Sequence, residues 1–593
     1  MGSTATLLGG LLGLMAAAGI GSGLTRLLGP IPGRWRLATS LVAGVAAIDL
    51  CVMLVLFLGG GVRGVKLVGI GAAVLGGCLL LWSLNYLRSE ATPRLGQFAD
   101  RWFFATIIAA LVINLAIAVA PSTKIDELHY HMLIPKRVME DGGIHLYLLP
   151  FEAAIFPQSG FQLGLTAAHA TGIPEAGNVL SWGLGAALIL LIAGVTKDLT
   201  GNTTAGWMTG AISAVGLYPS VWHVTSGPHA LGDLATVTAC LLALLPDGLT
   251  GEMKAQTRLL LVCLTAYTAA STKISVLPLS IVITFIGVHR AAARMGWQKA
   301  AGMALGVWVV FYGPILLWTT TQCRSPFGLA TASMFHSHYF GPDVIGKLAE
   351  SARDNQTGWM PFLAWLAPSV SIGVITAFGI LIYAARTRKG IFRILFALVC
   401  GQAILIAWLL PHGFRFLGGL QYAVLALGAW VVWPSRAGAR LIAAWWLVLA
   451  ATCLPWLAVQ AYYAKPFLKV DLGLTSRDSF LREYVAFADD FRVLNRILPG
   501  DAVIYVANLR LPSYYAPRPV IYTLEDLKGR GPLYLFTAGS GAPVTLGTFS
   551  CAEIVYEDKS AVSVVYRTPG RSAEHEHLTV ERCAVAGGNQ AGR

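Results

Sequence analysis

Apolar runs long enough to cross a bilayer recur along the chain from its first residues to residue 463. A transmembrane helix needs about 20 predominantly apolar residues. Runs of this kind predict spans near 4–24, 38–60, 65–87, 102–121, 176–196, 205–222, 231–246, 258–271, 274–289, 300–320, 361–384, 391–410, 416–433 and 441–463. The pattern predicts an α-helical polytopic membrane protein with about 13–14 transmembrane helices.

The pattern changes at residue 465, after which charged residues are frequent and no apolar run of span length remains. Apolar residues at three and four residue spacings predict an amphipathic helix over 478–498. Strands are predicted at 503–506, 533–536, 554–556 and 561–566. We therefore expect N-terminal transmembrane helices at 1–100, a transmembrane core at 101–464 and a water-facing α/β domain at 465–593.

Composition and charge support this division. Of the 593 residues, 55% are hydrophobic and only 12% are charged, which excludes a soluble multi-domain protein. Arginine and lysine cluster in short loops that alternating spans place on one side, which the positive-inside rule assigns to the cytoplasm. The loops at 122–175 and 321–360 and the C-terminal domain are then extracytoplasmic. The net charge of +13 reflects this topology, and we expect no nucleic-acid partner.

The nine cysteines mostly fall in apolar runs, where they act as small hydrophobic residues. Cys551 and Cys583 instead lie in the C-terminal domain and are candidates for a disulfide in an oxidising compartment. The sequence contains no CxxC, HExxH, Walker or GxGxxG signature in its required context.

The densest group of chemically active residues follows the predicted span at 102–121, in the segment from Lys124 to Gly143. A short helix from Asp126 along the membrane face would put Asp126 and Tyr130 on one face, and Glu127 and His131 on one face. Such acids suit catalysis. The alternative is a solvated loop helix whose charges keep it at the membrane interface.

Several motifs occur in a defined order along the chain. They are Asp126-Glu127-x-x-Tyr130-His131, Pro135-Lys136, Met139-Glu140-x-Gly142, Pro157-Gln158-Ser159-Gly160, Gly227-Pro228-x-Ala230-x-Gly232-Asp233, Ala270-Ser271-Thr272-Lys273 and Phe414-Arg415-Phe416. This order resembles that of GT-C superfamily glycosyltransferases, including the branch of the lipid A aminoarabinose transferase and protein O-mannosyltransferases. The resemblance covers roughly residues 100–463, and a C-terminal extracytoplasmic α/β domain is also usual in that family.

The resemblance implies a GT-C fold and an inverting transfer of a sugar. The donor would be a polyprenyl phosphate carrier, such as undecaprenyl or decaprenyl phosphate, and the acceptor an extracytoplasmic lipid, glycan or protein. The enzyme would lie in the bacterial cytoplasmic membrane, with its active site facing the periplasm or exterior.

The resemblance also implies roles for individual residues. Asp126, with Glu127 beside it, would be the catalytic base that accepts the proton of the attacking acceptor; Asp126 could instead cap the preceding helix. Residues expected to contact substrate or the lipid phosphate are Tyr130, His131, Lys136, Arg137, Gln158, Asp233, Lys273 and Arg415. Lys273 and Arg415 are the favoured phosphate partners, whereas Lys136 and Arg137 could equally hold lipid headgroups.

More than one role is possible for Asp233, His336 and His338. Asp233 could accept a hydrogen bond from the donor sugar, orient Lys273, or be an N-terminal helix charge. His336 and His338, in the second outer loop, could join Glu127 and His131 around a divalent cation such as Mg²⁺ or Mn²⁺, which some GT-C enzymes use, or could be solvated or contact substrate.

Two other classes compete with a glycosyltransferase. A transporter or flippase for a lipid-linked glycan would place charges in the middle of several spans and would show two related halves, whereas this chain gathers its ionisable groups at one face. A ligase or polymerase that joins glycan chains would have outer loops rich in arginine and histidine.

Overall fold

The computed structural model describes most of the chain, which divides into two compact units. The described residues are 3–88, 96–145, 161–250, 253–332, 334–337, 372–387, 390–409, 417, 419–433, 439–506, 511–522, 524–527, 531–539, 546, 549–564 and 573–585. The first unit, called the helical unit, comprises Met1–Ala120, Gln158–Trp318 and Ile345–Asp471. The second, called the loop–sheet unit, comprises Pro121–Pro157, Thr319–Val344 and Leu472–Arg593.

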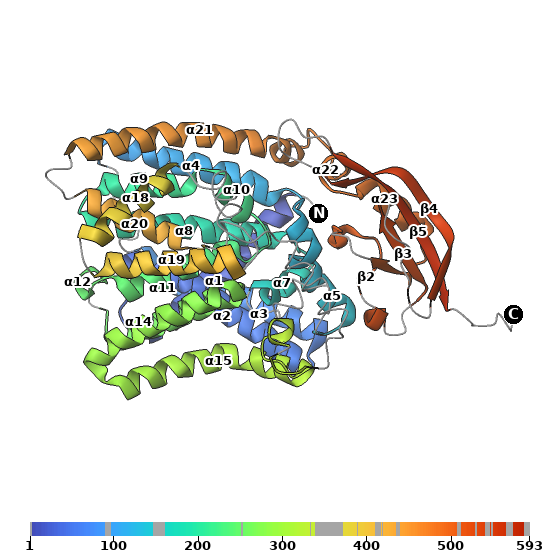
Figure 1. Cartoon of the computed structure of the whole chain (residues 1–593), viewed down its shortest axis with the longest axis horizontal. Helices are drawn as coiled ribbons and strands as arrows, with labels where there is room; N and C mark the ends of the chain where they lie inside the picture. Colours follow the sequence, from blue (N-terminus) through green and yellow to red (C-terminus); the bar gives the residue numbers. More distant parts are fainter. Residues whose placement is uncertain are drawn as a thin grey trace. The chain divides into compact units, whose positions relative to one another are not determined.

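The helical unit is a bundle of long apolar helices (Figure 1). Its described helices are α1 (Ser3–Leu27), α2 (Gly33–Phe57), α3 (Gly61–Arg88), α4 (Phe98–Val119), α7 (Phe161–Ala170), α8 (Ala176–Thr200), α9 (Thr203–Ala214), α10 (Leu217–Trp222), α11 (His229–Leu244), α12 (Asp247–Thr250), α13 (Ala255–Thr272), α14 (Leu277–Met295), α15 (Trp297–Cys323), α18 (Ile372–Thr387), α19 (Ile391–Leu409), α20 (Leu420–Val432) and α21 (Ala439–Asp471). Seven membrane-spanning candidates among the described segments have sufficient length and apolar character: α1, α2, α3, α4, α8, the segment Ile274–Met295 that includes α14, and α15. The chain is therefore a multi-pass membrane protein, as predicted.

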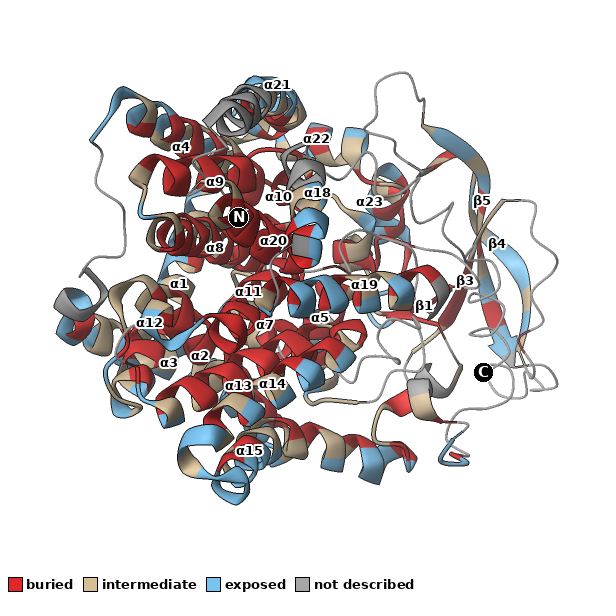
Figure 2. Cartoon of the chain, turned by 60° about the vertical axis from the view of Figure 1, so that its left-hand side comes forward, coloured by how far each residue is buried: buried red, intermediate tan, exposed pale blue. Residues whose placement is uncertain are grey.

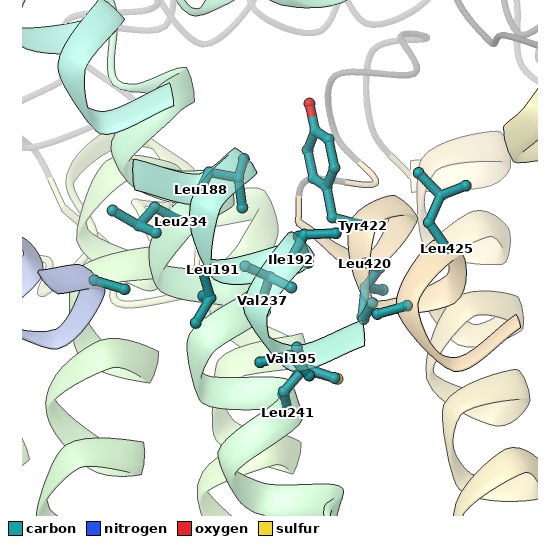
Figure 3. Packing of buried hydrophobic residues seen from close by; sticks show 14 of the residues in the cluster. Leu188, Leu191, Ile192, Val195, Leu234, Val237, Leu241, Leu420, Tyr422 and Leu425 are labelled. Atoms are coloured by element: carbon teal, nitrogen blue, oxygen red, sulfur yellow. The ribbon is translucent and has the colours of Figure 1, made fainter. Parts of the chain in front are cut away.

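The centre of the helical unit is formed by α8, α11 and α20 (Figure 2). Every residue of α11 is buried. Figure 3 shows leucine and valine side chains of α8 and α11 packed together, with Leu420 and Tyr422 of α20 beside them. A helix that is apolar on all sides belongs inside a bundle rather than at a polar surface, so α11 is held on all sides by other helices.

Small residues bring α1, α2 and α3 into close contact. A Cβ atom placed on Gly19 of α1 would lie 1.8 Å from the carbonyl oxygen of Gly76 in α3, and one on Gly44 of α2 would lie 1.9 Å from the carbonyl oxygen of Ala17. In a bilayer the hydrophobic effect does not drive helices together, because lipid is as apolar as the side chains. Membrane helices therefore associate through close van der Waals packing, which small residues allow.

The prediction of one span over 205–222 is wrong, because the chain breaks there into α9 and α10. Val215 is extended, and Gly216 has φ 118°, a conformation that glycine adopts without the clash of a Cβ atom. The break redirects the chain, so that Tyr218 and His223 become available to line a polar site.

The loop–sheet unit combines a helical loop segment with a mixed sheet. Its described elements are the π-helix η1 (Glu127–His131), α5 (Leu133–Asp141), η3 (Gly328–Thr331), α22 (Arg477–Tyr484), α23 (Ala488–Ile497), β1 (Val503–Val506), η6 (Ser513–Tyr515), β2 (Val520–Ile521), η7 (Leu524–Leu527), β3 (Leu533–Ala538), β4 (Phe549–Val564) and β5 (Glu574–Val585). The strand order is β2-β1-β3-β5-β4, in which β1 is parallel to β2 and β3, and β5 is antiparallel to β3 and β4. The α-helical membrane unit and this C-terminal sheet confirm the predicted fold class.

Two element predictions in this unit are corrected. The helix expected over 478–498 is divided into α22 and α23, because Phe487 takes a left-handed conformation (φ 57°) and its N–H donates to the carbonyl oxygen of Val562. The strands expected at 554–556 and 561–566 form a single strand up to Val564, because β-bulges absorb the intervening polar residues while pairing with β5 continues. Tyr566 lies outside the described residues.

The sheet also confirms two local predictions. Strands β1 and β3 begin at Val503 and Leu533, as expected from the apolar runs. Cys551 and Cys583 face each other on β4 and β5 and are joined by a disulfide.

Candidate functional site

A buried acid near the start of α11 is the centre of a polar cluster in the helical unit. Asp233 is 2% exposed, and its Oδ2 atom lies 2.9 Å from the hydroxyl of Tyr218 and 2.9 Å from Nε2 of His223. A carboxylate accepts hydrogen bonds, so the Tyr218 hydroxyl and the His223 Nε2–H both donate to it. Nδ1 of His223 is buried and has no hydrogen-bond partner among the described residues.

Close helix packing fixes this arrangement. Tyr218 lies on α10, and His223 is the residue that ends it. A Cβ atom on Gly185 of α8 would lie 3.2 Å from Nδ1 of His223, and one on Gly419, just before α20, would lie 2.2 Å from the carbonyl oxygen of Asp233. Glycine at these two positions lets α8 and α20 approach the cluster closely.

A second polar contact lies at the first residue of α11. Nζ of Lys273 lies 2.6 Å from Nδ1 of His229, the first residue of α11. Lys273 ends α13 in an extended conformation and is half-buried, and the ring of Trp222 lies 4.5 Å from that of His229. A lysine ammonium can only donate, so the imidazole accepts here through Nδ1. The predicted residues Asp233 and Lys273 thus belong to adjoining ends of packed helices, α11 and α13.

The opposite end of α11 is anchored by arginines. Nη1 of Arg290 lies 2.7 to 2.9 Å from the carbonyl oxygens of Ala243, Leu244 and Leu245. Nε of Arg258 lies 2.6 Å from the carbonyl oxygen of Leu242. Cations at a helix C-terminus satisfy its last carbonyls and oppose its negative dipole. The position of Asp233 along the bundle is therefore fixed from both ends of its helix.

Neutral polar side chains hold α10 in place. The hydroxyl of Ser220 donates to Oδ1 of Asn114 at 2.6 Å, and Nε2 of Gln460 donates to the Ser220 hydroxyl at 2.9 Å. These three residues come from α10, α4 and α21 and are all buried. Such hydrogen bonds substitute for water within apolar surroundings, so the short helix that carries Tyr218 is tied to two long ones.

The acidic loop segment folds differently from the predicted regular helix. Asp126 precedes a π-helical turn, Glu127–His131, which Met132 closes by donating its N–H to the carbonyl oxygen of Glu127 at 2.8 Å. Glu127 is buried and accepts a hydrogen bond from Ser122 at 3.0 Å, whereas Asp126 is half-buried. Single π-helical turns are rare and frequent at functional sites.

The same segment is attached to the C-terminal part of the loop–sheet unit. His129, which sequence reasoning missed, lies with Nδ1 3.1 Å from the carbonyl oxygen of Leu511 and 3.2 Å from the hydroxyl of Tyr522. Nζ of Lys136 donates to the carbonyl oxygens of Tyr514 at 3.0 Å and Ala516 at 3.2 Å. Burial lowers the pKa of the Lys136 ammonium. These contacts make Lys136 an anchor of the loop, while its expected binding of phosphate stays a prediction.

The remaining predicted residues divide into described and undescribed ones. Arg137 and His131 are buried, Tyr130 is half-buried, and the Tyr130 and His131 rings lie 4.1 Å apart. His336 is exposed on a turn. Gln158, His338 and Arg415 lie outside the described residues. Within the part of the chain that the structure describes, no group of three or more His, Cys, Asp or Glu side chains could hold a metal ion, so a divalent cation stays a prediction.

Sequence reasoning missed Tyr218, His223 and His229. Tyr218 and His223 lie in and just after a stretch taken for one continuous span, so the break at Gly216 was the missing signal. His229 occupies the variable position of the motif Gly227-Pro228-x-Ala230.

Comparison with known proteins gives similarity in structure only. No protein-family model matches the sequence, and no curated protein matches it. The structure is similar to ArnT from Cupriavidus metallidurans bound to undecaprenyl phosphate, with a TM-score of 0.49 and 13% identity over 81% of this chain and 98% of that one. For the apo state of the same protein the TM-score is 0.48 and the identity 14%, over 82% and 98% of the two chains. For the oligosaccharyltransferase from Archaeoglobus fulgidus the TM-score is 0.37 and the identity 11%, over 74% and 69%.

Proposed function

We propose that this protein is an inverting glycosyltransferase that moves a sugar from a polyprenyl phosphate carrier to an extracytoplasmic lipid, glycan or protein. We place it in the bacterial cytoplasmic membrane, with its active site toward the exterior. The observation that carries the proposal is the polar cluster inside the helical unit, in which Asp233 binds Tyr218 and His223 while Lys273 binds His229.

Ionisable residues within membrane helices are costly and therefore functional by default. Holding the helices together does not require ionisable residues here, because the neutral side chains of Ser220, Asn114 and Gln460 already connect α10 to α4 and α21. The cluster instead combines a carboxylate, an amine and two imidazoles. These groups can bind a sugar hydroxyl and a phosphate oxygen, which a polyprenyl phosphate sugar presents together.

In the proposed reaction the acceptor's hydroxyl or amine attacks the anomeric carbon of the sugar. The new bond from oxygen or nitrogen to that carbon forms as the bond between the carbon and the phosphate oxygen breaks, and the carrier phosphate leaves with the electron pair. Asp126 takes the acceptor's proton. Asp126 is half-buried before the π-helical turn, whereas Glu127 is fully buried and accepts a hydrogen bond from Ser122.

Lys273 is the proposed partner of the leaving phosphate. Its ammonium stabilises the charge that develops on the phosphate oxygen as the sugar departs. Asp233 is proposed as a positioning residue that holds the His223 ring in one orientation through Nε2, as carboxylates do for imidazoles elsewhere.

The proposal is tested with the purified full-length protein in lipid nanodiscs. The protein is incubated with lipid and glycan extract from its own envelope, and polyprenyl phosphate release is followed by mass spectrometry. We expect release with the wild type and its loss with Asp126→Asn, while Asp501→Asn, which changes an exposed acid on a turn, behaves as wild type. Equal release by all three proteins would contradict the assignment of Asp126, and no release by any would contradict glycosyl transfer.

A further inference from the structure

A cavity of about 320 Å³ lies within the helical unit, between α1, α2, α3, α7 and α8. This volume falls within the range of about 300–1,000 Å³ that is typical of small-molecule sites. More than half of its lining residues are glycine or alanine. None of Tyr218, His223, His229, Asp233 and Lys273 lines it, so the cavity is distinct from the polar cluster described above.

One acid faces this otherwise apolar space. Among the described residues that line the cavity, Asp49 of α2 is the only ionisable one, and it is 4% exposed. Both of its carboxyl oxygens are buried, and among the described residues only the backbone N–H of Gly164 is directed at them, so at least one oxygen lacks a partner. A buried polar group left without a partner typically costs about 1–3 kcal/mol, and an acid at membrane depth indicates a functional site.

The wall opposite Asp49 is shaped to accept the carboxyl group. A Cβ atom on Gly164 of α7 would lie 2.1 Å from Oδ1 of Asp49, closer than any side chain could approach. Glycine at position 164 therefore leaves room for the acid where every other residue would displace it.

The cavity is reached from the surface that faces lipid. Leu12 of α1 and Ile70 and Val74 of α3 belong to its wall and are 51%, 47% and 64% exposed. Helices α1 and α3 are both membrane-spanning candidates, so their exposed apolar side chains meet hydrocarbon rather than water. A ligand that enters here comes laterally from the bilayer and is itself largely apolar.

We propose that this cavity binds an amphiphile that has a hydrocarbon chain and a small hydrogen-bond donor at its end, either a hydroxyl or a primary amine. The chain fills the apolar space, and the donor satisfies the carboxyl group of Asp49. A phosphate head would carry its charge into a wall whose described residues include no cationic side chain. The ligand therefore differs in chemistry from the polyprenyl phosphate of the proposed reaction, and the site does not depend on that reaction.

The test is photocrosslinking of the full-length protein in nanodiscs. The probes are four C12 chains that carry a diazirine and end in a hydroxyl, an amine, a phosphate or a methyl group, and labelled peptides are mapped by mass spectrometry. We expect the alcohol or the amine to label peptides of α2 and α7. Asp49→Leu should lower that labelling about tenfold, the effect of losing one hydrogen bond to a buried group, and leave labelling by the methyl-ended probe unchanged. A preference for the hydroxyl over the amine, or the reverse, distinguishes the two donors.

A matched pair of glycine variants tests the cavity independently of Asp49. Gly13 lines the cavity and Gly71 does not, and both have open space where a Cβ atom would lie. Gly13→Leu should reduce labelling of α2 and α7 by all probes, and Gly71→Leu should not. The proposal is overturned if the phosphate or methyl-ended probe labels the wild type as well as the alcohol and amine do, if Asp49→Leu changes nothing, or if the two glycine variants behave alike.

Discussion

Nε2 of His223 lies 2.9 Å from Oδ2 of Asp233 within a bundle of apolar helices. The contact depends on the break at Gly216, which ends one helix and starts the short one that His223 terminates. It also joins residues of α10 and α11 that share no regular spacing in the sequence. The relationship supports the proposal that the acid acts through an imidazole, rather than only as a charge near the start of a helix.

Replacing Asp233 by Asn should lower the rate of sugar transfer about 100-fold, within the range attributed to a positioned acid–base group. Tyr218→Phe should cost less than about tenfold, because His223 still donates to the carboxylate after one neutral hydrogen bond is lost. The measurement is kcat for both variants in nanodiscs at matched protein levels. If Tyr218→Phe is as damaging as Asp233→Asn, the hydrogen-bond network and not the carboxylate is essential.

Replacing Lys273 by Met should weaken binding of the polyprenyl phosphate carrier about tenfold, since a charge-assisted hydrogen bond contributes about 1.5–3 kcal/mol. The control is Lys299→Met, which removes an exposed lysine near the start of α15. Carrier binding is measured by native mass spectrometry, which does not require the acceptor. Equal affinity in the wild type and Lys273→Met would refute the proposed phosphate contact.

Asp490 should make the loop–sheet unit sensitive to pH. It is 3% exposed on α23, accepts a hydrogen bond from Tyr556 at 2.9 Å, and burial raises the pKa of its carboxyl group to about 6 from a usual value of 3.8. Between about pH 4 and pH 6 the carboxyl group of Asp490 is protonated in the folded state and ionised in the unfolded state. The protonated acid therefore contributes stability below about pH 4, and this contribution is lost as the pH rises to about 6.

Asp490→Asn should remove this pH dependence and stabilise α23 and β4 at pH 7 by on the order of 1 kcal/mol. The measurement is the rate of amide hydrogen exchange in peptides from α23 and β4, corrected for the intrinsic effect of pH and compared between the wild type and Asp490→Asn. Asp501→Asn serves as the control, because Asp501 is exposed. Wild-type protection that does not change from pH 4 to pH 6 would contradict the prediction.

The disulfide between Cys551 and Cys583 should stabilise the β4–β5 pair. A disulfide typically contributes about 2–4 kcal/mol by restricting the unfolded chain, and this one connects residues 32 apart in the sequence. Cys551→Ser with Cys583→Ser should speed hydrogen exchange in β4 and β5, while Cys51→Ser, which changes an exposed cysteine of α2, should not. Labelling of both thiols in the untreated wild type would show that the pair is not bonded.

The multi-pass membrane character was predictable from the sequence, because a segment that crosses the bilayer must be apolar over its whole length and must satisfy its own backbone hydrogen bonds as a helix. The disulfide pair and strand β1 were also predictable, the first from cysteines outside the apolar runs and the second from a short apolar run after a turn. The break at Gly216 was not, because an apolar segment with one glycine has the same pattern as a continuous helix. The partner of Asp233 depended on that break, so the prediction that Asp233 is important carried no information about His223.

In the loop–sheet unit the limits were different. A π-helical turn at Glu127 has the same composition as an α-helical one, and Phe487 divides the helix expected over 478–498 through a backbone contact with Val562 that is distant in the sequence. Lys136 was expected to bind either the carrier phosphate or lipid headgroups, yet its described partners are two backbone carbonyls and the carboxylate of Glu140 at 3.8 Å. Such partners depend on tertiary contacts that no local pattern contains.

The most direct test of the central claim is mass spectrometry of envelope lipids and glycans from cells that carry the wild type, a deletion or Asp126→Asn at matched expression. The account predicts that a sugar-sized mass is lost from one acceptor in both mutants and that the unused polyprenyl phosphate sugar accumulates. An unchanged envelope in the deletion, or full rescue of the deletion by Asp126→Asn, would contradict it.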